Sequence, residues 1–215
     1  MERIYTDRAD AGRRLGAALL RKLRGSPVLV LGLPRGGVAV AAEVARLLSA
    51  PHDALVVRKV GAPFQPELAL GAVGPGGIQI RNEPLLASLS DGAAYFELGV
   101  TRERLEVERR ERTYREGRAP LDLAGRDVVL VDDGIATGAT ARCAVAASRA
   151  LGAKSVTVAV PVAPGEVLAE LAAVADDVVC LEAPRPFRAV GAWYEHFEPV
   201  EDDEVRELLR GGRPA

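Results

Sequence analysis

The sequence predicts an α/β protein of three layers, in which a mostly parallel central sheet carries helices on both faces. Two observations predict this class. Short apolar runs, each long enough for one strand, alternate along the chain with segments whose apolar residues recur at helical spacing. The runs are continuously apolar, which is typical of strands covered on both faces. Strands that alternate with helices imply right-handed crossovers and a mostly parallel sheet.

The first quarter of the chain should supply two helices and two strands. Leu15, Leu19 and Leu23 recur at helical spacing, and a Gly-Ser-Pro sequence ends their helix. A short apolar strand, a glycine-rich loop and a second helix follow. The expected bounds are a helix over 7–23, a strand over 28–31, a helix over 38–48 and a strand over 55–57.

Residues 61–119 interrupt this rhythm, and we expect them to form an inserted flap. A strand over 69–73, a Gly-Pro-Gly-Gly turn and a strand over 78–80 predict a hairpin. Residues 101–117 are dense in Glu and Arg, which predicts a solvated helix that projects or covers an edge. Its apolar stripe is thin and is expected at Leu98, Leu105 and Tyr114.

The α/β rhythm returns after residue 125, and the chain is expected to form a single domain over 1–215. A tail segment over 184–200 is rich in aromatic residues and is expected as a separate small segment after the last strand. The expected strands are 128–131, 156–160 and 178–181, and the expected helices are 138–151, 164–175 and 202–210.

Composition limits the classes of function. The formal net charge is -2, which disfavours a broad nucleic-acid-binding face. Two cysteines and two histidines disfavour a tetrahedral zinc site. The start of the sequence lacks a signal peptide and no apolar run is long enough to span a membrane, so we expect a cytoplasmic protein. Frequent arginine with rare lysine and asparagine fits a thermophile, and it fits a GC-rich genome equally well.

The strongest chemical signal follows the apolar strand at 128–131. Two carboxylates, Asp132 and Asp133, come directly after this strand, and a glycine- and threonine-rich loop then opens a helix. In open parallel sheets, ligands bind beyond the carboxyl ends of the strands, and the N-terminus of a helix binds phosphate. The predicted phosphate-binding residues are Gly134, Ile135, Ala136, Thr137, Gly138, Ala139 and Thr140.

The acidic pair predicts what accompanies the phosphate. Asp132 and Asp133 would repel a phosphate, but they can accept hydrogen bonds from sugar hydroxyls. A phosphate at one end and vicinal hydroxyls at the other describe a ribose 5-phosphate. The two common nucleotide-loop patterns, Gly-x-x-x-x-Gly-Lys-Ser/Thr and Gly-x-Gly-x-x-Gly, are absent from the sequence. The alternative interpretation is an ordinary helix cap at Thr137 beside two solvated aspartates.

Residues 129–140 resemble the phosphoribosyl pyrophosphate (PRPP) signature of the type I phosphoribosyltransferases. The resemblance implies that Asp132, Asp133, Arg58 and Lys59 are catalytic residues, with the last two reaching pyrophosphate. It also implies that the aromatic tail forms a base-binding hood. The implied pyrophosphate loop comprises Pro34, Arg35, Gly36 and Gly37, and the implied base-stacking candidates are Phe187, Trp193 and Tyr194.

Each of these weaker sites has a structural alternative. Arg35 could be an ordinary surface residue, Lys59 a solvated strand end, and the aromatic cluster plain core.

The resemblance further implies an activity. Ribose 5-phosphate would pass from PRPP to a nucleobase or similar nitrogen nucleophile, with release of pyrophosphate. Mg²⁺ would be held by substrate oxygens and water, and by Asp132 or Asp133 if any protein ligand takes part. Purine-salvage members often carry Asp where this chain has Ala136. A non-catalytic regulator that senses PRPP or nucleotides in the same pocket is therefore the alternative, and a homodimer is a further expectation.

Overall fold

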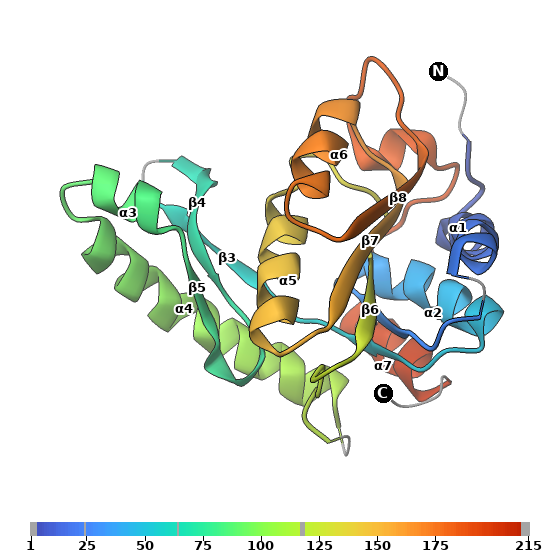
Figure 1. Ribbon diagram of the computed structural model, residues 1–215, viewed down its shortest axis with the longest axis horizontal. Coiled ribbons are helices and arrows are strands. Elements are labelled where there is room, and N and C mark those ends of the chain that lie inside the picture. The colour runs from blue at the N-terminus through green and yellow to red at the C-terminus, as the bar shows by residue number, and fades with distance from the viewer. Residues whose placement is uncertain (1–3, 24, 64, 117–118, 212–215) are drawn as a thin grey trace.

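The computed structural model describes residues 4–23, 25–63, 65–116 and 119–211. Its central sheet has five parallel strands in the order β2-β1-β6-β7-β8 (Figure 1). The strands are β1 Leu29–Gly32, β2 His52–Ala54, β6 Asp127–Val131, β7 Ser155–Val162 and β8 Asp177–Glu182. The expected α/β class with a mostly parallel sheet is confirmed.

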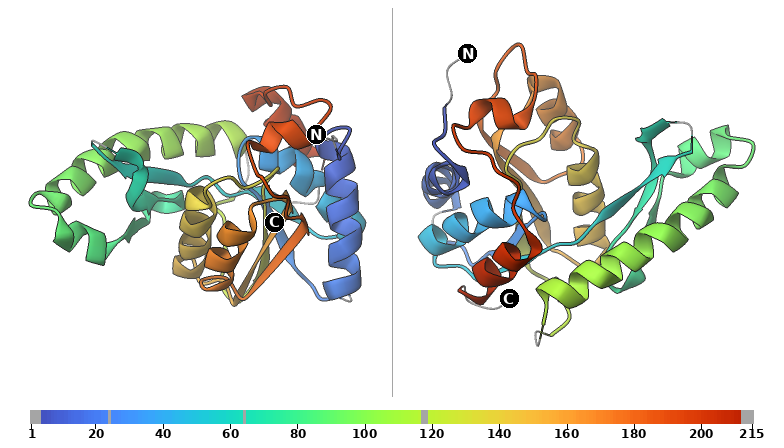
Figure 2. Two further views of the ribbon diagram at one scale, coloured as in Figure 1. Left: turned by 90° about the horizontal axis from the view of Figure 1, so that it is seen from above. Right: turned by 180° about the vertical axis from the view of Figure 1, so that it is seen from behind.

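Helices cover both faces of this sheet, as Figure 2 shows from two further directions. The strands alternate their side chains between the two layers, so that Val30 packs with α1 and α2, whereas Leu31 packs with α5 and α6. This alternation explains why the strands are continuously apolar in sequence. The covering helices are α1 Arg8–Leu23, α2 Gly36–Leu48, α5 Ala139–Ala150 and α6 Gly165–Ala172.

The prediction of a strand at 55–57 is wrong, because these residues lie between β2 and β3. The strand that pairs with β1 is β2, which contains the buried polar residues His52 and Asp53. Leu55 and Val56 are buried in two different cores while the chain crosses from the central sheet to the flap. Their apolar character therefore indicated burial, which a connecting segment can also require, and not a strand.

The region expected as a flap has its own antiparallel sheet in the order β3-β4-β5, which begins at Arg58 and not at residue 61. The elements from β3 to α4 are called the flap below. Val73 pairs with Gln79 across the β4–β5 hairpin, which confirms the predicted hairpin. A short 3-10 helix, η1, turns the chain between the two strands. The flap elements are β3 Arg58–Ala62, β4 Gln65–Val73, η1 Pro75–Gly77, β5 Gln79–Arg81, α3 Glu83–Ser88 and α4 Gly92–Tyr114.

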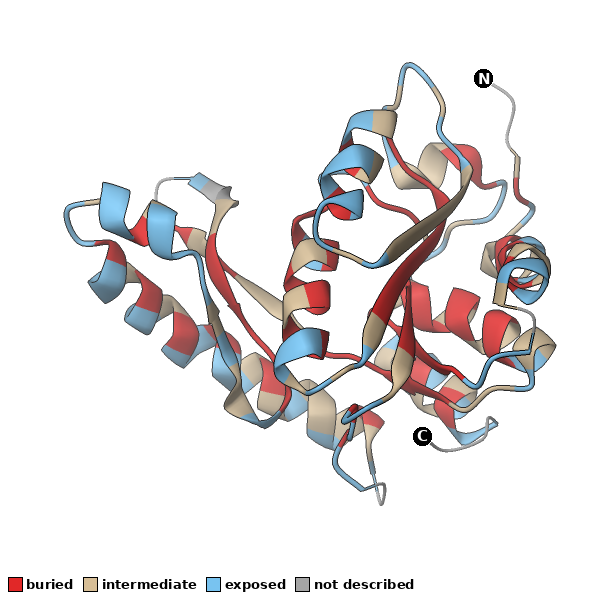
Figure 3. Cartoon of the chain, in the orientation of Figure 1, coloured by how far each residue is buried: buried red, intermediate tan, exposed pale blue. Residues whose placement is uncertain are grey.

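Helix α4 is longer than predicted and buries a different face. It begins nine residues before the expected start at residue 101, and the expected end at residue 117 lies outside the described residues. Leu98 and Leu105 are 72% and 66% exposed, so two of the three predicted stripe residues were wrong. The buried stripe, visible in Figure 3, contains Phe96, Val100, Val107 and Tyr114.

The chain ends in an aromatic tail and a last helix. The tail contains η2 Val190–Trp193, and α7 Asp202–Arg210 packs near α2 and the C-terminal end of α4 (Figures 1 and 2). Val205 and Leu209 of α7 join the core that the flap shares. In the described part of the chain, every helix is too short or too polar to cross a membrane.

A buried ion pair ties the end of α4 to the central sheet. The guanidinium of Arg115 donates to Asp53 at 3.0 Å, and these side chains are only 11% and 3% exposed. Removing one partner of a buried pair leaves the other charge poorly compensated. Asp53 still accepts from the backbone N–H of Ala54, which limits the penalty.

We therefore expect Arg115→Ala to lower the free energy of unfolding by about 2 kcal/mol, measured by urea denaturation. Arg112→Ala is the matched control, because Arg112 is an exposed arginine on the same helix. Equal stability of the two variants would contradict this assignment.

Candidate functional site

The site lies where the order of the strands reverses direction. The chain moves from β1 outward to β2 through α2, and from β6 outward to β7 through α5, so the crevice between β1 and β6 is a topological switch point. Ligands of open parallel sheets bind at such points, beyond the carboxyl ends of the strands. The backbone N–H of Leu33 donates to the carbonyl of Val131 at 2.8 Å, which joins the loops that follow the two strands.

The first loop, Pro34 to Gly37, packs directly against the acidic pair. A Cβ atom on Gly36 would lie 1.9 Å from the Oδ2 of Asp133, and one on Gly37 would lie 2.9 Å from the Oδ1 of Asp132. Neither position leaves room for a side chain. The two glycines therefore permit a close approach between the first loop and the acidic pair. The peptide bond between Pro34 and Arg35 is cis.

Asp133 is held from several sides. Its Oδ2 accepts from the Nε of Arg8 at 2.8 Å, and its backbone carbonyl accepts from the hydroxyl of Tyr194. Its backbone N–H donates to the Oδ1 of Asp132 at 2.9 Å. Burial raises the pKa of both aspartates, and the positive charge of Arg8 opposes this rise at Asp133. The pair is thus a rigid acceptor group in a poorly solvated crevice.

The phosphate loop, residues 134–140, leads from the acidic pair into α5. Gly138 occupies the left-handed region at φ 72°, and no described side chain caps the helix start. The first-turn N–H groups of α5 are therefore available for an anion. Thr137 and Thr140 are exposed and can add hydroxyl donors. Ile135 is buried and its N–H donates to Val162, so the structure places it as a support of the loop.

The sequence places Arg58 and Lys59 at the end of the expected strand 55–57 of the central sheet. In the structure they are instead the first two residues of β3 in the flap. Arg58 pairs with Glu103 of α4 at 2.9 Å. The charge of Lys59 acts on Cys143 of α5: burial raises the pKa of that thiol, and the charges of Arg142 and Lys59 oppose the rise. Lys59 also lines a cavity of about 380 Å³ between β3 and α4.

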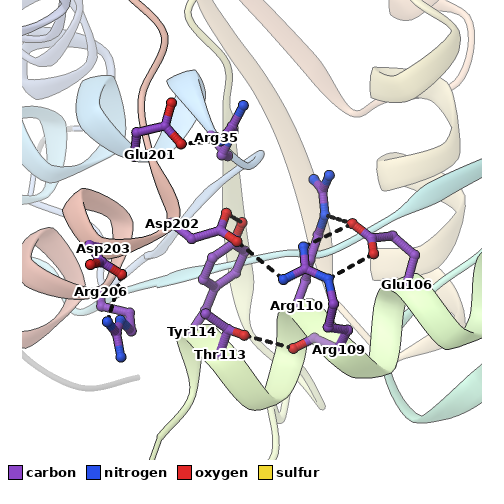
Figure 4. A network of polar contacts seen from close by, with 10 residues as sticks. All are labelled: Arg35, Glu106, Arg109, Arg110, Thr113, Tyr114, Glu201, Asp202, Asp203 and Arg206. Carbon is purple, nitrogen blue, oxygen red and sulfur yellow. Dashed lines mark hydrogen bonds and ion pairs between the residues drawn. The ribbon is translucent and has the colours of Figure 1, made fainter.

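Arg35 points from the first loop toward the C-terminal segment, where it donates to Glu201 at 3.0 Å (Figure 4). Both side chains are well exposed, and exposed pairs of this kind contribute about 0–1 kcal/mol. The contact is weak enough for Arg35 to exchange Glu201 for a phosphate group, which offers a charge-assisted and bidentate partner.

Asp202, which follows Glu201, anchors the flap helix α4. Asp202 accepts from the hydroxyl of Tyr114 at 2.7 Å and from Arg109 at 3.2 Å, both on α4 (Figure 4). These hydrogen bonds hold the pKa of Asp202 below its usual range, with Tyr114 as the largest cause. The start of α7 therefore contacts the first loop and the flap helix through neighbouring side chains.

The aromatic tail is mostly core. Trp193 and Tyr194 are buried, the ring of Tyr194 lies 5.3 Å from that of Tyr5, and its hydroxyl holds Asp133. This burial favours a supporting role for both residues. Phe187 is half-buried and lies 6.3 Å from Trp193, which leaves it as the aromatic side chain of the three best placed to meet a ligand. Val190 of the same tail packs over Gly134, where a Cβ would lie 2.5 Å away.

Sequence reasoning did not find Arg8, Glu201 and Asp202. Arg8 lies 125 residues from Asp133, and no spacing rule links a helix start to a distant strand end. The sequence predicts a short helix over 202–210, which the structure has, but assigns no contact to Glu201 or Asp202. The one available signal was weak, namely that charged residues begin both terminal helices.

A parallel sheet with an acidic pair, a diglycine loop and a helix start at its switch point defines the type I phosphoribosyltransferase class. The family model described as "Phosphoribosyl transferase domain" matches residues 2–195, and the chain belongs to this family.

Two similar proteins come from strains of Mycobacterium tuberculosis, and both are named provisionally as phosphoribosyl transferases. Each is 49% identical over 207 residues, which is 96% of this chain and 46% of the relative. The chain thus spans about half the length of these curated relatives. The crystal structure of TT1426 from Thermus thermophilus is 44% identical, with a TM-score of 0.90, and covers 98% of this chain and 99% of that one.

Proposed function

We propose that the chain transfers ribose 5-phosphate from PRPP to a nucleobase or similar nitrogen nucleophile and releases pyrophosphate. The observation that carries this proposal is the convergence of the acidic pair, the diglycine loop and the start of α5 at one switch point. PRPP has three polar parts to match these three features: a 5′-phosphate, the ribose hydroxyls and a pyrophosphate on C1.

Each part of the site has a role in this reaction. The N–H groups of the phosphate loop would hold the 5′-phosphate, with hydroxyl donors from Thr137 and Thr140. Asp132 and Asp133 would accept hydrogen bonds from the ribose hydroxyls and favour the positive charge that develops on the ring as pyrophosphate leaves. The first loop would bind pyrophosphate through its backbone and Arg35, and Lys59 would approach from the flap.

The donor set fits Mg²⁺ that is bound chiefly through the substrate. No group of three or more His, Cys, Asp or Glu side chains forms a metal cage among the described residues. Asp132 and Asp133 nevertheless present hard oxygen ligands beside the diglycine loop, and Mg²⁺ is usually held by one or two carboxylates together with phosphates and water. When bound, it would neutralise charge on the departing pyrophosphate.

A PRPP- or nucleotide-sensing regulator is the second candidate function. Ala136, next to Thr137, is exposed and brings no polar group to a base. Such a protein would use the same pocket without turnover. Turnover therefore distinguishes the enzyme from the regulator.

The test is release of pyrophosphate from PRPP with Mg²⁺ and a panel of nucleobases. We expect turnover with at least one base, and we expect Lys59→Ala to lower kcat/KM about tenfold, because a charge that meets the leaving group is lost. Lys154→Ala is the control, since Lys154 pairs with Asp127 at the opposite end of β6 from the acidic pair. Tight PRPP binding without turnover across the panel would favour the regulator.

A further inference from the structure

Arg8 makes an unusual set of contacts for the first residue of a helix. Its Nε donates to the Oδ2 of Asp133 at 2.8 Å, and its Nη1 donates to the carbonyl of Glu198 at 2.8 Å. The centre of its guanidinium lies 3.9 Å from the ring centroid of Phe197. One side chain thus joins α1, the loop after β6 and the aromatic tail.

The burial of this pair separates it from the other ion pairs near the site. The side chains of Arg8 and Asp133 are 12% and 15% exposed, whereas those of Arg35 and Glu201 are 37% and 72% exposed. Exposed pairs contribute little, but a charge-assisted hydrogen bond in a poorly solvated crevice is strong. The cation–π contact with Phe197 fixes the guanidinium further.

We propose that Arg8 is the positioning residue for Asp133, so that α1 and the aromatic tail together set the orientation of the carboxylate that receives the ribose hydroxyls. The inference rests on the proposed function of the acidic pair. Arg8 occupies the Oδ2 of Asp133 beside Gly36, where a Cβ on that glycine would also lie 2.9 Å from the Nε of Arg8. With Oδ2 held by Arg8, Oδ1 is the carboxylate oxygen that would accept from the ribose hydroxyls.

The polar groups that contact Asp133 come from three parts of the chain. Asp132 precedes it, Arg8 faces it from α1, and the hydroxyl of Tyr194 holds its backbone from the tail. Tyr194 restrains the main chain and Arg8 restrains the side chain. Loss of Arg8 alone should therefore free the carboxylate to rotate while the loop backbone stays in place.

Because Arg8 restrains only the side chain of Asp133, its role can be tested by binding. PRPP and inorganic pyrophosphate are each titrated into the protein by calorimetry in the presence of Mg²⁺. Arg8→Gln should weaken PRPP binding about tenfold, because the ribose hydroxyls lose an oriented acceptor. It should leave pyrophosphate, which has no ribose, within about twofold of the wild type. Arg8→Lys keeps the charge without the planar fork and should recover part of the loss. Arg13→Gln, at an exposed arginine of the same helix, should change neither affinity.

Three results would overturn the inference. Equal weakening of PRPP and pyrophosphate would show that Arg8 acts only as a positive charge on anions. Unchanged PRPP binding in a folded Arg8→Gln variant would show that Asp133 needs no such support. If that variant does not fold, unchanged PRPP binding by the soluble fraction of Arg8→Ala decides the same point. A wild-type protein that binds no PRPP would overturn the proposed function and this inference with it.

Discussion

Gly36→Ala should lower kcat/KM for pyrophosphate release by at least about 100-fold, since misplacement of a reacting group by about 1 Å is enough for such a loss. The new Cβ would lie 1.9 Å from the Oδ2 and 2.7 Å from the Cγ of Asp133, and 2.9 Å from the Nε of Arg8. No rotamer of alanine relieves these contacts. Either the first loop moves away from the acidic pair, or the Arg8–Asp133 pair breaks.

Gly74→Ala is the matched control for this substitution. Gly74 has φ of -125°, which alanine adopts freely, and its nearest neighbour would lie 3.4 Å from the new Cβ. Calorimetry should show that Gly36→Ala loses PRPP binding while Gly74→Ala retains it. Wild-type kinetics in a folded Gly36→Ala protein would mean that the first loop and the acidic pair do not form one site.

Asp132→Asn should reduce kcat/KM about 100-fold and, at neutral pH, raise the melting temperature. Asparagine keeps the oxygen that accepts from the Asp133 N–H but loses the negative charge that would face the developing positive charge on ribose. The stability gain follows from the pKa. Burial and the neighbouring charge of Asp133 raise the pKa of Asp132 well above that of an ordinary aspartic acid.

The sign of this effect is opposite to that of most carboxylates. An acid whose pKa is raised by folding stabilises the native state below its unfolded pKa, and that contribution is lost as the pH rises through the folded-state pKa. At neutral pH the ionised Asp132 is therefore destabilising. Asp176 is the control, because hydrogen bonds lower its pKa, first among them the one from the Val156 N–H.

Melting curves of both variants between about pH 4 and pH 8 check the prediction. The range starts near the ordinary pKa of a carboxyl group. Asp132→Asn should gain on the wild type as the pH rises, and Asp176→Asn should fall behind it. An Asp132→Asn protein that is less stable than the wild type at neutral pH would show that the carboxylate is well solvated or well paired when folded.

The sequence was most informative where one local rule suffices. Continuous apolar runs identified four of the five central strands, and the Gly-Pro-Gly-Gly turn identified the β4–β5 hairpin. The acidic pair followed by a threonine- and glycine-rich loop could be assigned to a switch point, because strand ends and helix starts meet there in any open parallel sheet.

Elsewhere, tertiary context decided the outcome. Leu55 and Val56 are buried because they pass between cores, and polar His52 and Asp53 form the strand because that edge of the sheet is covered by α7 and the Arg115 ion pair. On α4, the exposed Leu98 and Leu105 repeat as well as the buried residues do, so spacing alone could not identify the buried face.

The contacts that complete the candidate site are all long-range. Arg8 to Asp133, Tyr194 to Asp133 and Arg35 to Glu201 span 125, 61 and 166 residues of chain. No periodicity or motif encodes such pairings. They follow only from the way the sheet brings α1, the tail and α7 around the carboxyl ends of β1 and β6.

A crystal structure of the protein with ribose 5-phosphate tests the central claim most directly. We predict that the phosphate lies against the backbone N–H groups of residues 136–140 and that both ring hydroxyls face Asp132 and Asp133. A sugar bound with its phosphate away from the start of α5, or with the two carboxylates turned from its hydroxyls, would contradict the account.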